Sequence, residues 1–491
     1  MDPGTITQQT RRLARNVKWL SLQELMIRLI GLATAIYLAR VLGPAAYGSL
    51  GLALALIGIP GTLVQAGTGS RAIRLTALYP GSVPEIYAQT TGLRIVMTVI
   101  VFATLILCVE LLSRTFSIPS NLLILCSFLL LRPALTVAWA FKGLDQMHVT
   151  AMADIAEKAL LFGALLLLVK GQGNDLLWVP VLESLTALAV VLWLRKRLGA
   201  VYPGLSISFN YKAWPGVTRE SLPLGMAALL GSVYLHGAVL LLGWLDTSSS
   251  AANFLVAQKL MLTMTILLFV INSSAFPSMS RLLSSNVSQA LKLVSSLLRY
   301  YLVLIIPVIF LLAVYANEIL SLLFGASYTD SGPVLMVLLF ALPFMAISHS
   351  LLLLFRAIPK PRAVLISQVL SALVLFLAAV ILIPRFGATG AAAAVVAAEA
   401  SGMVLLFWLA IRSIGSTPLE IRCFAPLVAG VIVTMIFLLM DDWSLYLSLP
   451  LAALLYMLAL WSMKAISADE IRSLPKIISA ALNKEPEEQK P

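Results

Sequence analysis

The chain has 491 residues, of which 60% are hydrophobic and only 11% are charged, and its formal net charge is +12. An ordinary soluble domain has about 25% charged residues, so this composition excludes a soluble protein and predicts a polytopic membrane protein. We assign the excess of Lys and Arg to membrane topology and expect no nucleic-acid partner, because these residues lie mainly between the apolar segments.

A basic segment, residues 1–18, precedes two apolar segments that cover about Trp19 to Arg40 and Tyr47 to Ser70. A Leu-Gly-Pro-Ala-Ala turn separates them, and a bend is expected near Pro60 in the second. Each is long enough to cross a bilayer, which takes about 20 helical residues. The first contains Glu24 and Arg28, four residues apart and therefore on one helix face. Because ionised groups are costly in lipid, we expect this face to point into a protein or water-filled interior.

Further apolar segments follow along the whole chain. They lie near residues 90–111, 121–142, 151–170, 176–195, 222–245, 251–274, 297–320, 333–356, 363–384, 389–412, 423–440 and 443–463. The sequence therefore predicts an all-α protein with about fourteen transmembrane helices. The longest polar connection, residues 196–221, is expected to be a cytoplasmic linker between two six-helix lobes. These lobes are residues 19–195 and 222–412, and residues 423–463 add two further helices.

A weak internal similarity supports two lobes that are parallel repeats. Phe141 and Lys142 align with Phe355 and Arg356 in the second lobe. Six helices in each lobe are an even number, so both lobes would enter the membrane from the same side.

Lys and Arg are concentrated in alternate connections, for example residues 195–197, whereas Asp246 and Asp330 lie in the others. By the positive-inside rule, both termini are expected in the cytoplasm and the protein in the cell (inner) membrane. The polar tail, residues 464–491, is expected to stay cytoplasmic.

Three sequence runs resemble Wzx-type polysaccharide or O-antigen flippases, which belong to the multidrug/oligosaccharidyl-lipid/polysaccharide exporter superfamily. They are Ala39-Arg-Val-Leu-Gly-Pro-Ala-Ala-Tyr-Gly48 with Gly69-Ser-Arg71 after it, Tyr328-Thr-Asp-Ser-Gly-Pro333, and Leu382-Ile-Pro-Arg-Phe-Gly-Ala-Thr-Gly-Ala391 with Glu399 after it.

The resemblance implies a two-lobed transporter that works by alternating access, coupled to an ion gradient. It would move undecaprenyl-diphosphate-linked oligosaccharide across the cytoplasmic membrane for O-antigen or exopolysaccharide synthesis. The implied partners are this lipid-linked oligosaccharide and membrane lipids, with a polysaccharide polymerase and glycosyltransferases as further candidates. No cofactor is implied.

In the related lipid II flippases, cationic residues on the first and eighth helices meet the diphosphate, and Arg28 and Lys259 lie on the matching helices. We therefore assign Arg28, Glu24, Lys259, Gln258 and His236 to a substrate-binding cavity. Two other interpretations stay open. Arg28 can be a structural partner of Glu24, and Lys259 can extend toward the membrane surface instead.

Carboxylates within spans are candidates for ion coupling, because an unpaired one is costly there. Asp154 and Glu157 lie on the fifth span, Glu183 on the sixth and Glu399 on the twelfth. Asp154 is expected to be neutralised by Lys158, four residues later, whereas Glu157 has no evident partner in its own helix. Glu183 and Glu399 are interpreted as lone carboxylates.

The remaining polar residues of the spans have simpler interpretations. Arg94 and Arg132 lie near span ends and are expected to extend to the membrane surface. The cysteines, Cys108, Cys126 and Cys423, have no ligand-like spacing, so neither metal site nor disulfide is expected.

No catalytic motif appears in the sequence, and we expect no enzyme. A membrane glycan polymerase or ligase would carry a large outer loop with catalytic residues, and the outer connections are short. A multidrug exporter of the same superfamily is the alternative that stays open.

Overall fold

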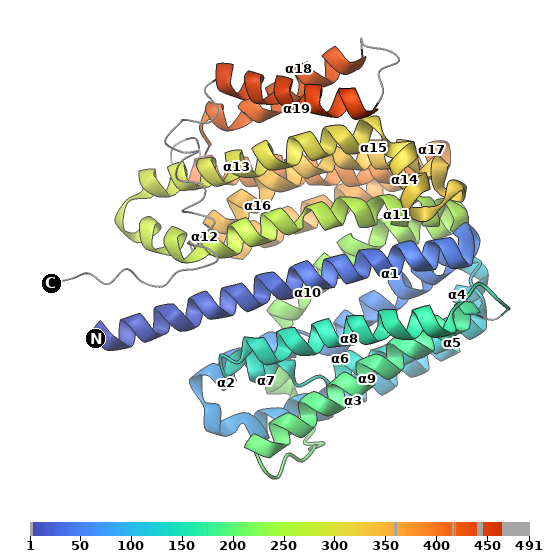
Figure 1. The fold of residues 1–491 in the computed structure, drawn as a ribbon. Coiled ribbons are helices and arrows are strands. Elements are labelled where there is room, and N and C mark those ends of the chain that lie inside the picture. The colour runs from blue at the N-terminus through green and yellow to red at the C-terminus, as the bar shows by residue number, and fades with distance from the viewer. Residues whose placement is uncertain are drawn as a thin grey trace.

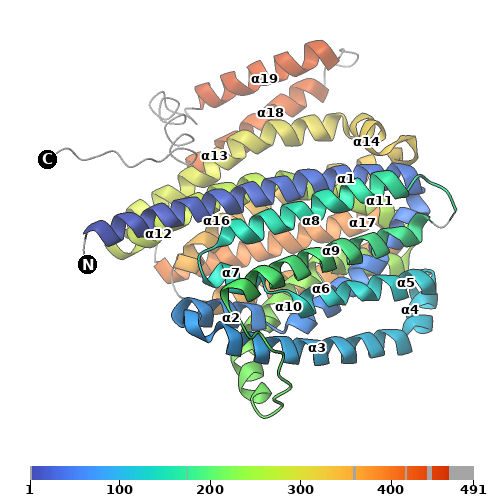
Figure 2. The ribbon, with the colours of Figure 1, turned by 60° about the horizontal axis from the view of Figure 1, so that its bottom comes forward.

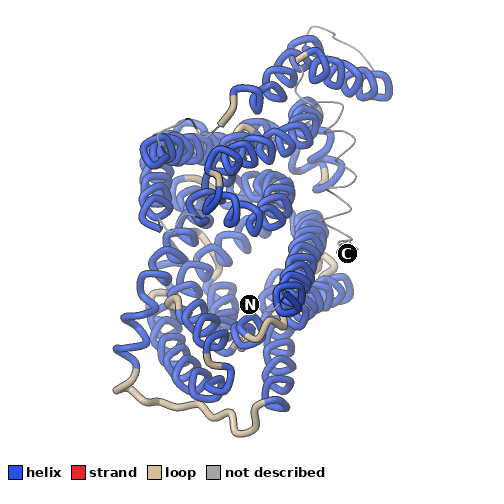
Figure 3. The backbone as a smooth tube through the Cα atoms, turned by 90° about the vertical axis from the view of Figure 1, so that its left-hand side faces the viewer, coloured by secondary structure: helices blue, strands red, loops and turns tan. Residues whose placement is uncertain are grey.

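The computed structural model describes residues 3–173, 175–357, 361–414, 417, 419–438 and 445–463. Within these ranges the chain is helical and has no β-strand (Figure 3). The predicted all-α class is therefore confirmed. The tail of residues 464–491, and with it the expectation of a cytoplasmic tail, lies outside the described residues, as do Lys360, Asp441 and Asp442.

Long helices alternate with short ones. The α-helices are α1 (Pro3–Gln65), α2 (Thr68–Leu78), α3 (Val83–Leu107), α4 (Val109–Phe116), α5 (Ser120–Ser127), α6 (Leu131–Leu135), α7 (Ala138–Gly143), α8 (Met147–Leu168), α9 (Asp175–Val201), α10 (Trp214–Leu245), α11 (Ser248–Met264), α12 (Ile266–Ser285), α13 (Val287–Val314), α14 (Ala316–Phe324), α15 (Gly332–Leu339), α16 (Ala341–Ala357), α17 (Pro361–Ile414), α18 (Ala425–Leu438) and α19 (Leu445–Ser462). Turns of 3₁₀ helix are η1 (Pro80–Ser82), η2 (Phe128–Leu130), η3 (Ala326–Ser331) and η4 (Ile421–Phe424).

Two glycines divide the longest helices into pairs of spans. Gly43 has φ 74° within α1, and Gly387 has φ 52° within α17. Only glycine adopts such a conformation readily, so the chain reverses at both positions. The predicted hairpin at Gly43 is therefore present. The helix continues through Pro60 to Gln65, however, so the expected bend there is not a break in the helix.

Nine stretches of the described residues are long and apolar enough to cross a membrane. Two of them, Lys18–Leu78 and Ala363–Ile414, contain the kinks at Gly43 and Gly387 and so hold two spans each. Helix α8 is not among the nine stretches because it carries three charged residues. Together with α8, α18 and α19, the nine stretches match the predicted set of spans.

The helices form two bundles, and α1 lies at the boundary between them (Figure 1). We call α1–α9 the first bundle and α10–α17 the second bundle. The first half of α1 runs beside α8 of the first bundle and α11 of the second (Figure 2). Helices α18 and α19 pack on α13, away from α1. The residues between the bundles, 202–213, are fewer than expected because α9 extends to Val201 and α10 begins at Trp214.

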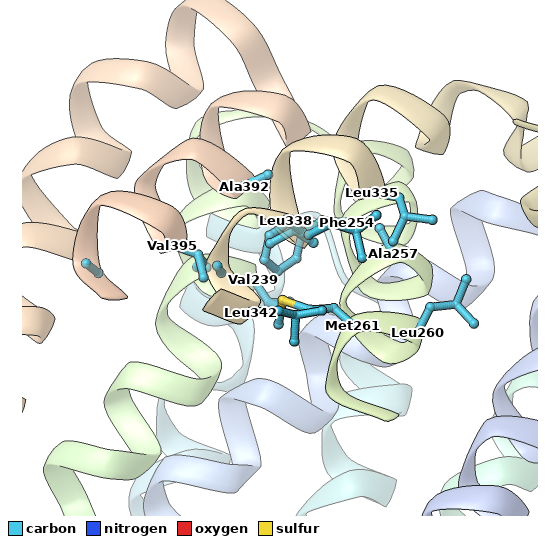
Figure 4. Close-up of a cluster of buried hydrophobic side chains, with 14 of the residues drawn as sticks. Val239, Phe254, Ala257, Leu260, Met261, Leu335, Leu338, Leu342, Ala392 and Val395 are labelled. Atoms are coloured by element: carbon cyan, nitrogen blue, oxygen red, sulfur yellow. The ribbon is translucent and has the colours of Figure 1, made fainter. Parts of the chain in front are cut away.

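A buried apolar cluster in the second bundle fixes the rotation of α11. Phe254, Ala257 and Met261 follow helical spacing on one face of α11. They pack with a cluster that includes Leu338 of α15 and Leu342 of α16 (Figure 4). Gln258 and Lys259 therefore lie on other faces of the helix, toward the first bundle.

Candidate functional site

A cavity of about 390 Å³ lies between the two bundles, and we call it the central cavity. It is lined by α1, α8, α9, α10 and α11, mostly with apolar side chains. Its polar lining side chains, among the described residues, include Lys158, Glu183, His236, Gln258 and Lys259. Three of the residues predicted for a substrate cavity, His236, Gln258 and Lys259, are thus together here.

Glycines of α1 make room for two of these side chains. A Cβ atom built on Gly31 would lie 3.1 Å from Lys259 Nζ, and one built on Gly58 would lie 2.5 Å from His236 Nε2. Lys259 therefore extends across the bundle boundary to α1.

Arg28 is fully engaged with protein groups. Its Nη2 lies 2.6 Å from Glu24 Oε1, and its Nη1 donates to Thr265 Oγ1 at 2.7 Å and to the carbonyl of Leu262. A guanidinium at the last carbonyls of α11 caps the helix where it breaks before α12. Glu24 and Arg28 are not among the described residues that line the central cavity, whereas Ile27 of the same helix is.

The intramembrane carboxylates of the first bundle form an ion-pair network. Arg132 Nη2 lies 3.2 Å from Asp154 Oδ1 and 3.0 Å from Glu157 Oε2. Lys158 Nζ lies 3.2 Å from Glu183 Oε1 and 3.8 Å from Glu157 Oε1. Among the described side chains this network joins two cations with three carboxylates on α6, α8 and α9.

The network corrects four expectations. Asp154 pairs with Arg132, and accepts a hydrogen bond from Gln23 of α1 at 2.7 Å, so Lys158 is not its partner. Glu183 is not a lone carboxylate, because Lys158 contacts it.

Glu157, expected to have no partner in its own helix, lies 3.8 Å from Lys158 of that helix. Arg132, expected to extend to the membrane surface, pairs with Asp154 and Glu157 of α8 while 42% of its side chain stays exposed. Helical spacing identified neighbours within α8 but contains no information about side chains that other helices supply.

A second cavity, of about 520 Å³, lies within the first bundle, and we call it the first-bundle cavity. Its charged lining residues, among those described, are Arg94, Arg132, Lys142, Asp154, Glu157 and Glu183. Glu183 therefore lines both cavities.

Arg94 is buried, with 1% exposure, rather than extended to the membrane surface. Its Nε donates to Thr68 Oγ1 at 2.8 Å, and its Nη1 to the carbonyl of Thr136 at 3.3 Å. Thr136 is extended, with ψ 133°, and interrupts the fourth span between α6 and α7. Arg94 thus satisfies the backbone at a helix break, which is tolerated at membrane depth only where protein or a cavity surrounds it.

Glu399 lies in the second bundle, apart from the network. Tyr234 donates a hydrogen bond to Glu399 Oε1 at 2.5 Å, so Glu399 is not alone. Both residues line a cavity of about 230 Å³ together with His349, Gln368 and several serines.

The bundles contact each other at both ends of the central cavity. At the end nearest residues 202–213, Arg71 Nε lies 2.7 Å from Glu220 Oε2. At the opposite end, Arg40 donates to the carbonyls of Leu322 and Leu323, and Tyr328 donates to the carbonyl of Ala39 at 3.2 Å. We call these the linker end and the Gly43 end.

Residues 13–283 match the family model described as "Polysaccharide biosynthesis protein". The chain belongs to this family. Residues 244–467 also match the model "Lipid II flippase MurJ". A search of curated proteins gave no match. The family assignment agrees with the resemblance found in the sequence and places the chain among polytopic membrane transport proteins rather than enzymes.

Solved structures share the fold of this family member. A lipid II flippase MurJ in an inward closed conformation has a TM-score of 0.71 at 14% identity, covering 94% of this chain and 99% of that one. An inward-facing MATE multidrug resistance transporter has a TM-score of 0.62 at 15% identity, covering 80% and 98%. A transporter of the same superfamily from Pyrococcus furiosus has a TM-score of 0.57 at 12% identity, covering 82% and 96%.

We expect Gly31→Val to destabilise this family member by up to about 1 kcal/mol, because the new side chain displaces the ammonium end of the flexible Lys259 side chain. Gly163→Val on α8 is the matched control, since a Cβ there has nothing within 4 Å. Thermal unfolding in detergent gives both values. Adding Lys259→Ala should restore the Gly31→Val protein. An equal loss in both valine variants would contradict this account.

Proposed function

We propose that the protein is a flippase that moves undecaprenyl-diphosphate-linked oligosaccharide units across the cytoplasmic membrane by alternating access. The observation that carries this proposal is the cationic central cavity, where Lys259 of the second bundle reaches α1 of the first. An anionic head group must cross about 30 Å of hydrocarbon, and such a cavity offers it compensating charge. Membership of the polysaccharide biosynthesis protein family supports this cargo class.

The test is reconstitution into liposomes with a fluorescent undecaprenyl diphosphoryl sugar. We expect the protein to transfer the lipid between leaflets, and Lys259→Gln to reduce the rate. A membrane-impermeant quencher reports the leaflet that holds the lipid. Leaflet transfer no faster than in protein-free liposomes would contradict the proposal.

A multidrug exporter is the second candidate, favoured by the likeness to the MATE transporter. Its substrates would be lipid-free organic cations, which the cationic lining of the central cavity disfavours. Uptake of such compounds into the same liposomes separates the two activities.

We propose that the linker end faces the cytoplasm, with both termini on that side. The arrangement is supported by the basic residues there, such as Arg71 and residues 195–197. Reporter fusions after Arg197 should read as internal, and fusions after Asp246 and Asp330 as external. A reversed pattern would contradict this orientation.

A polysaccharide polymerase and glycosyltransferases are the proposed functional partners in the same membrane.

We propose that a proton or sodium gradient drives transport through intramembrane carboxylates. The candidates are Asp154, Glu157 and Glu183, which line the first-bundle cavity, and Glu399, which lines the cavity of about 230 Å³ in the second bundle. We expect at least one of the four neutral variants, to Asn or Gln, to lose glycan export while reaching the membrane at normal levels. Full export by all four would exclude coupling through these residues.

A further inference from the structure

Lys158 is a second cation in the central cavity, on the wall that faces Lys259. It lies on α8 of the first bundle, whereas Lys259 lies on α11 of the second. The Lys158 side chain is 27% exposed, so it is partly open to the cavity. Both ammonium groups thus line one cavity, and their like charges repel each other there.

Resting on the flippase function proposed above, we propose that Lys158 is a second contact for the diphosphate of the cargo, and that the cargo phosphate displaces Glu183 from Lys158.

The charge of the cavity supports a diphosphate ligand. The charged side chains that line it, among the described residues, are two ammonium groups and one carboxylate. A diphosphate diester carries a negative charge on each phosphate, so each ammonium can compensate one of them. In a cavity lined mostly by apolar side chains this attraction is stronger than in bulk solvent. Arg28 cannot serve in the same way without giving up Glu24 and Thr265.

The geometry also decides which carboxylate is displaced. Glu157 is only 2% exposed, and Arg132 holds it at 3.0 Å, while its distance to Lys158 is the longer one, 3.8 Å. Glu183 is 23% exposed and approaches Lys158 at 3.2 Å. Glu183 therefore exchanges with a phosphate oxygen, while Glu157 stays with Arg132.

The position of Glu183 gives the exchange a consequence. Because Glu183 lines both cavities, the displaced carboxylate still faces the first-bundle cavity. A proton or sodium ion that enters that cavity can neutralise it there. Cargo binding at Lys158 and cation uptake at Glu183 thus favour each other.

The experiment measures binding of undecaprenyl diphosphate and undecaprenyl monophosphate to the purified full-length protein in detergent, for instance by native mass spectrometry. We expect Lys158→Gln to weaken diphosphate binding by about tenfold and to remove the preference for diphosphate over monophosphate. We expect Lys158→Arg to retain that preference. Lys196→Gln, on the exposed end of α9, removes the same charge outside the cavity and should bind like the unaltered protein.

The direction in which Glu183→Gln changes diphosphate affinity is the decisive test. It removes the competitor for Lys158, so diphosphate should bind more tightly, by several-fold, although an ion pair has been lost. A purely structural role for the pair predicts weaker binding in both variants, and that result overturns the inference. This variant keeps Lys158 in place, so it tests the inference even if Lys158→Gln does not fold.

The binding of the unaltered protein shows whether a failure concerns this inference alone or the proposed function as well. If the unaltered protein binds the diphosphate lipid and Lys158→Gln binds it equally well, the inference fails while the flippase function stands. If the unaltered protein binds neither lipid, both fail.

Discussion

Arg132→Ala is expected to destabilise the protein by about 1–3 kcal/mol and to reduce its amount in the membrane, because buried Glu157 loses a partner, although 42% of the Arg132 side chain is exposed. The guanidinium contacts Asp154 and Glu157, and Glu157 is almost fully buried. Removing the cation leaves two carboxylates side by side, with Lys158 as the other nearby cation of this network. Thermal unfolding in detergent, followed by size-exclusion chromatography with fluorescence detection, measures the change.

A surface pair provides the matched control for this prediction. Arg114 lies 3.0 Å from Glu110, with 79% and 63% of the two side chains exposed, so Arg114→Ala should cost less than about 1 kcal/mol. Adding Glu157→Gln to Arg132→Ala should recover part of the loss, because it removes one of the unpaired charges. If Arg132→Ala and Arg114→Ala have equal effects, the network does not stabilise the first bundle.

Arg28→Ala is expected to reduce export of surface glycan by about tenfold or more. The change removes the hydrogen bonds that join Arg28 of α1 to Leu262 and Thr265 at the break between α11 and α12. Arg28→Lys should recover only part of the export, because an ammonium cannot reach Glu24, Leu262 and Thr265 in the planar geometry of a guanidinium. Surface glycan and protein in isolated membranes are measured in parallel.

The double change Glu24→Gln with Arg28→Met separates charge pairing from the link to α11. It leaves no unpaired carboxylate, so membrane levels should return to normal. Export should stay low, because the contacts with Leu262 and Thr265 are still missing. Restored export in this variant would show that Arg28 serves only to neutralise Glu24.

The sequence predicted features that depend on local chemistry. The turns at Gly43 and Gly387 were predictable because a proline or a run of small residues accompanies a glycine between two apolar segments. The set of spans followed from length and hydropathy. The sequence assigned Lys259, Gln258 and His236 to one cavity, and all three line the central cavity; their role as substrate ligands stays a prediction.

Partners from distant helices could not be predicted in this way. Spacing along α8 suggested Lys158 for Asp154, but the fold supplies Arg132 to Asp154 and Glu183 to Lys158. Arg132 follows a 3₁₀ turn, and Arg94 meets a break at Thr136. Pro133, which cannot donate to the carbonyl four residues earlier, marks the first interruption, whereas no such residue marks the break at Thr136. The sequence placed Arg94 and Arg132 at the membrane surface, whereas Arg94 is buried and the partly exposed Arg132 pairs with α8.

The first half of α1 is an unbroken helix that is bonded to both bundles within six residues. Gln23 donates to Asp154 of α8, and Tyr37 donates to the carbonyl of Val169 just after α8. On the other side, Arg28 donates to the carbonyl of Leu262 in α11 and to Thr265 just after it. In the alternating-access cycle proposed above, α1 cannot keep both attachments when the bundles separate at the linker end. One set of bonds then has to break, and either Asp154 or the break between α11 and α12 loses its partner on α1 once in each cycle.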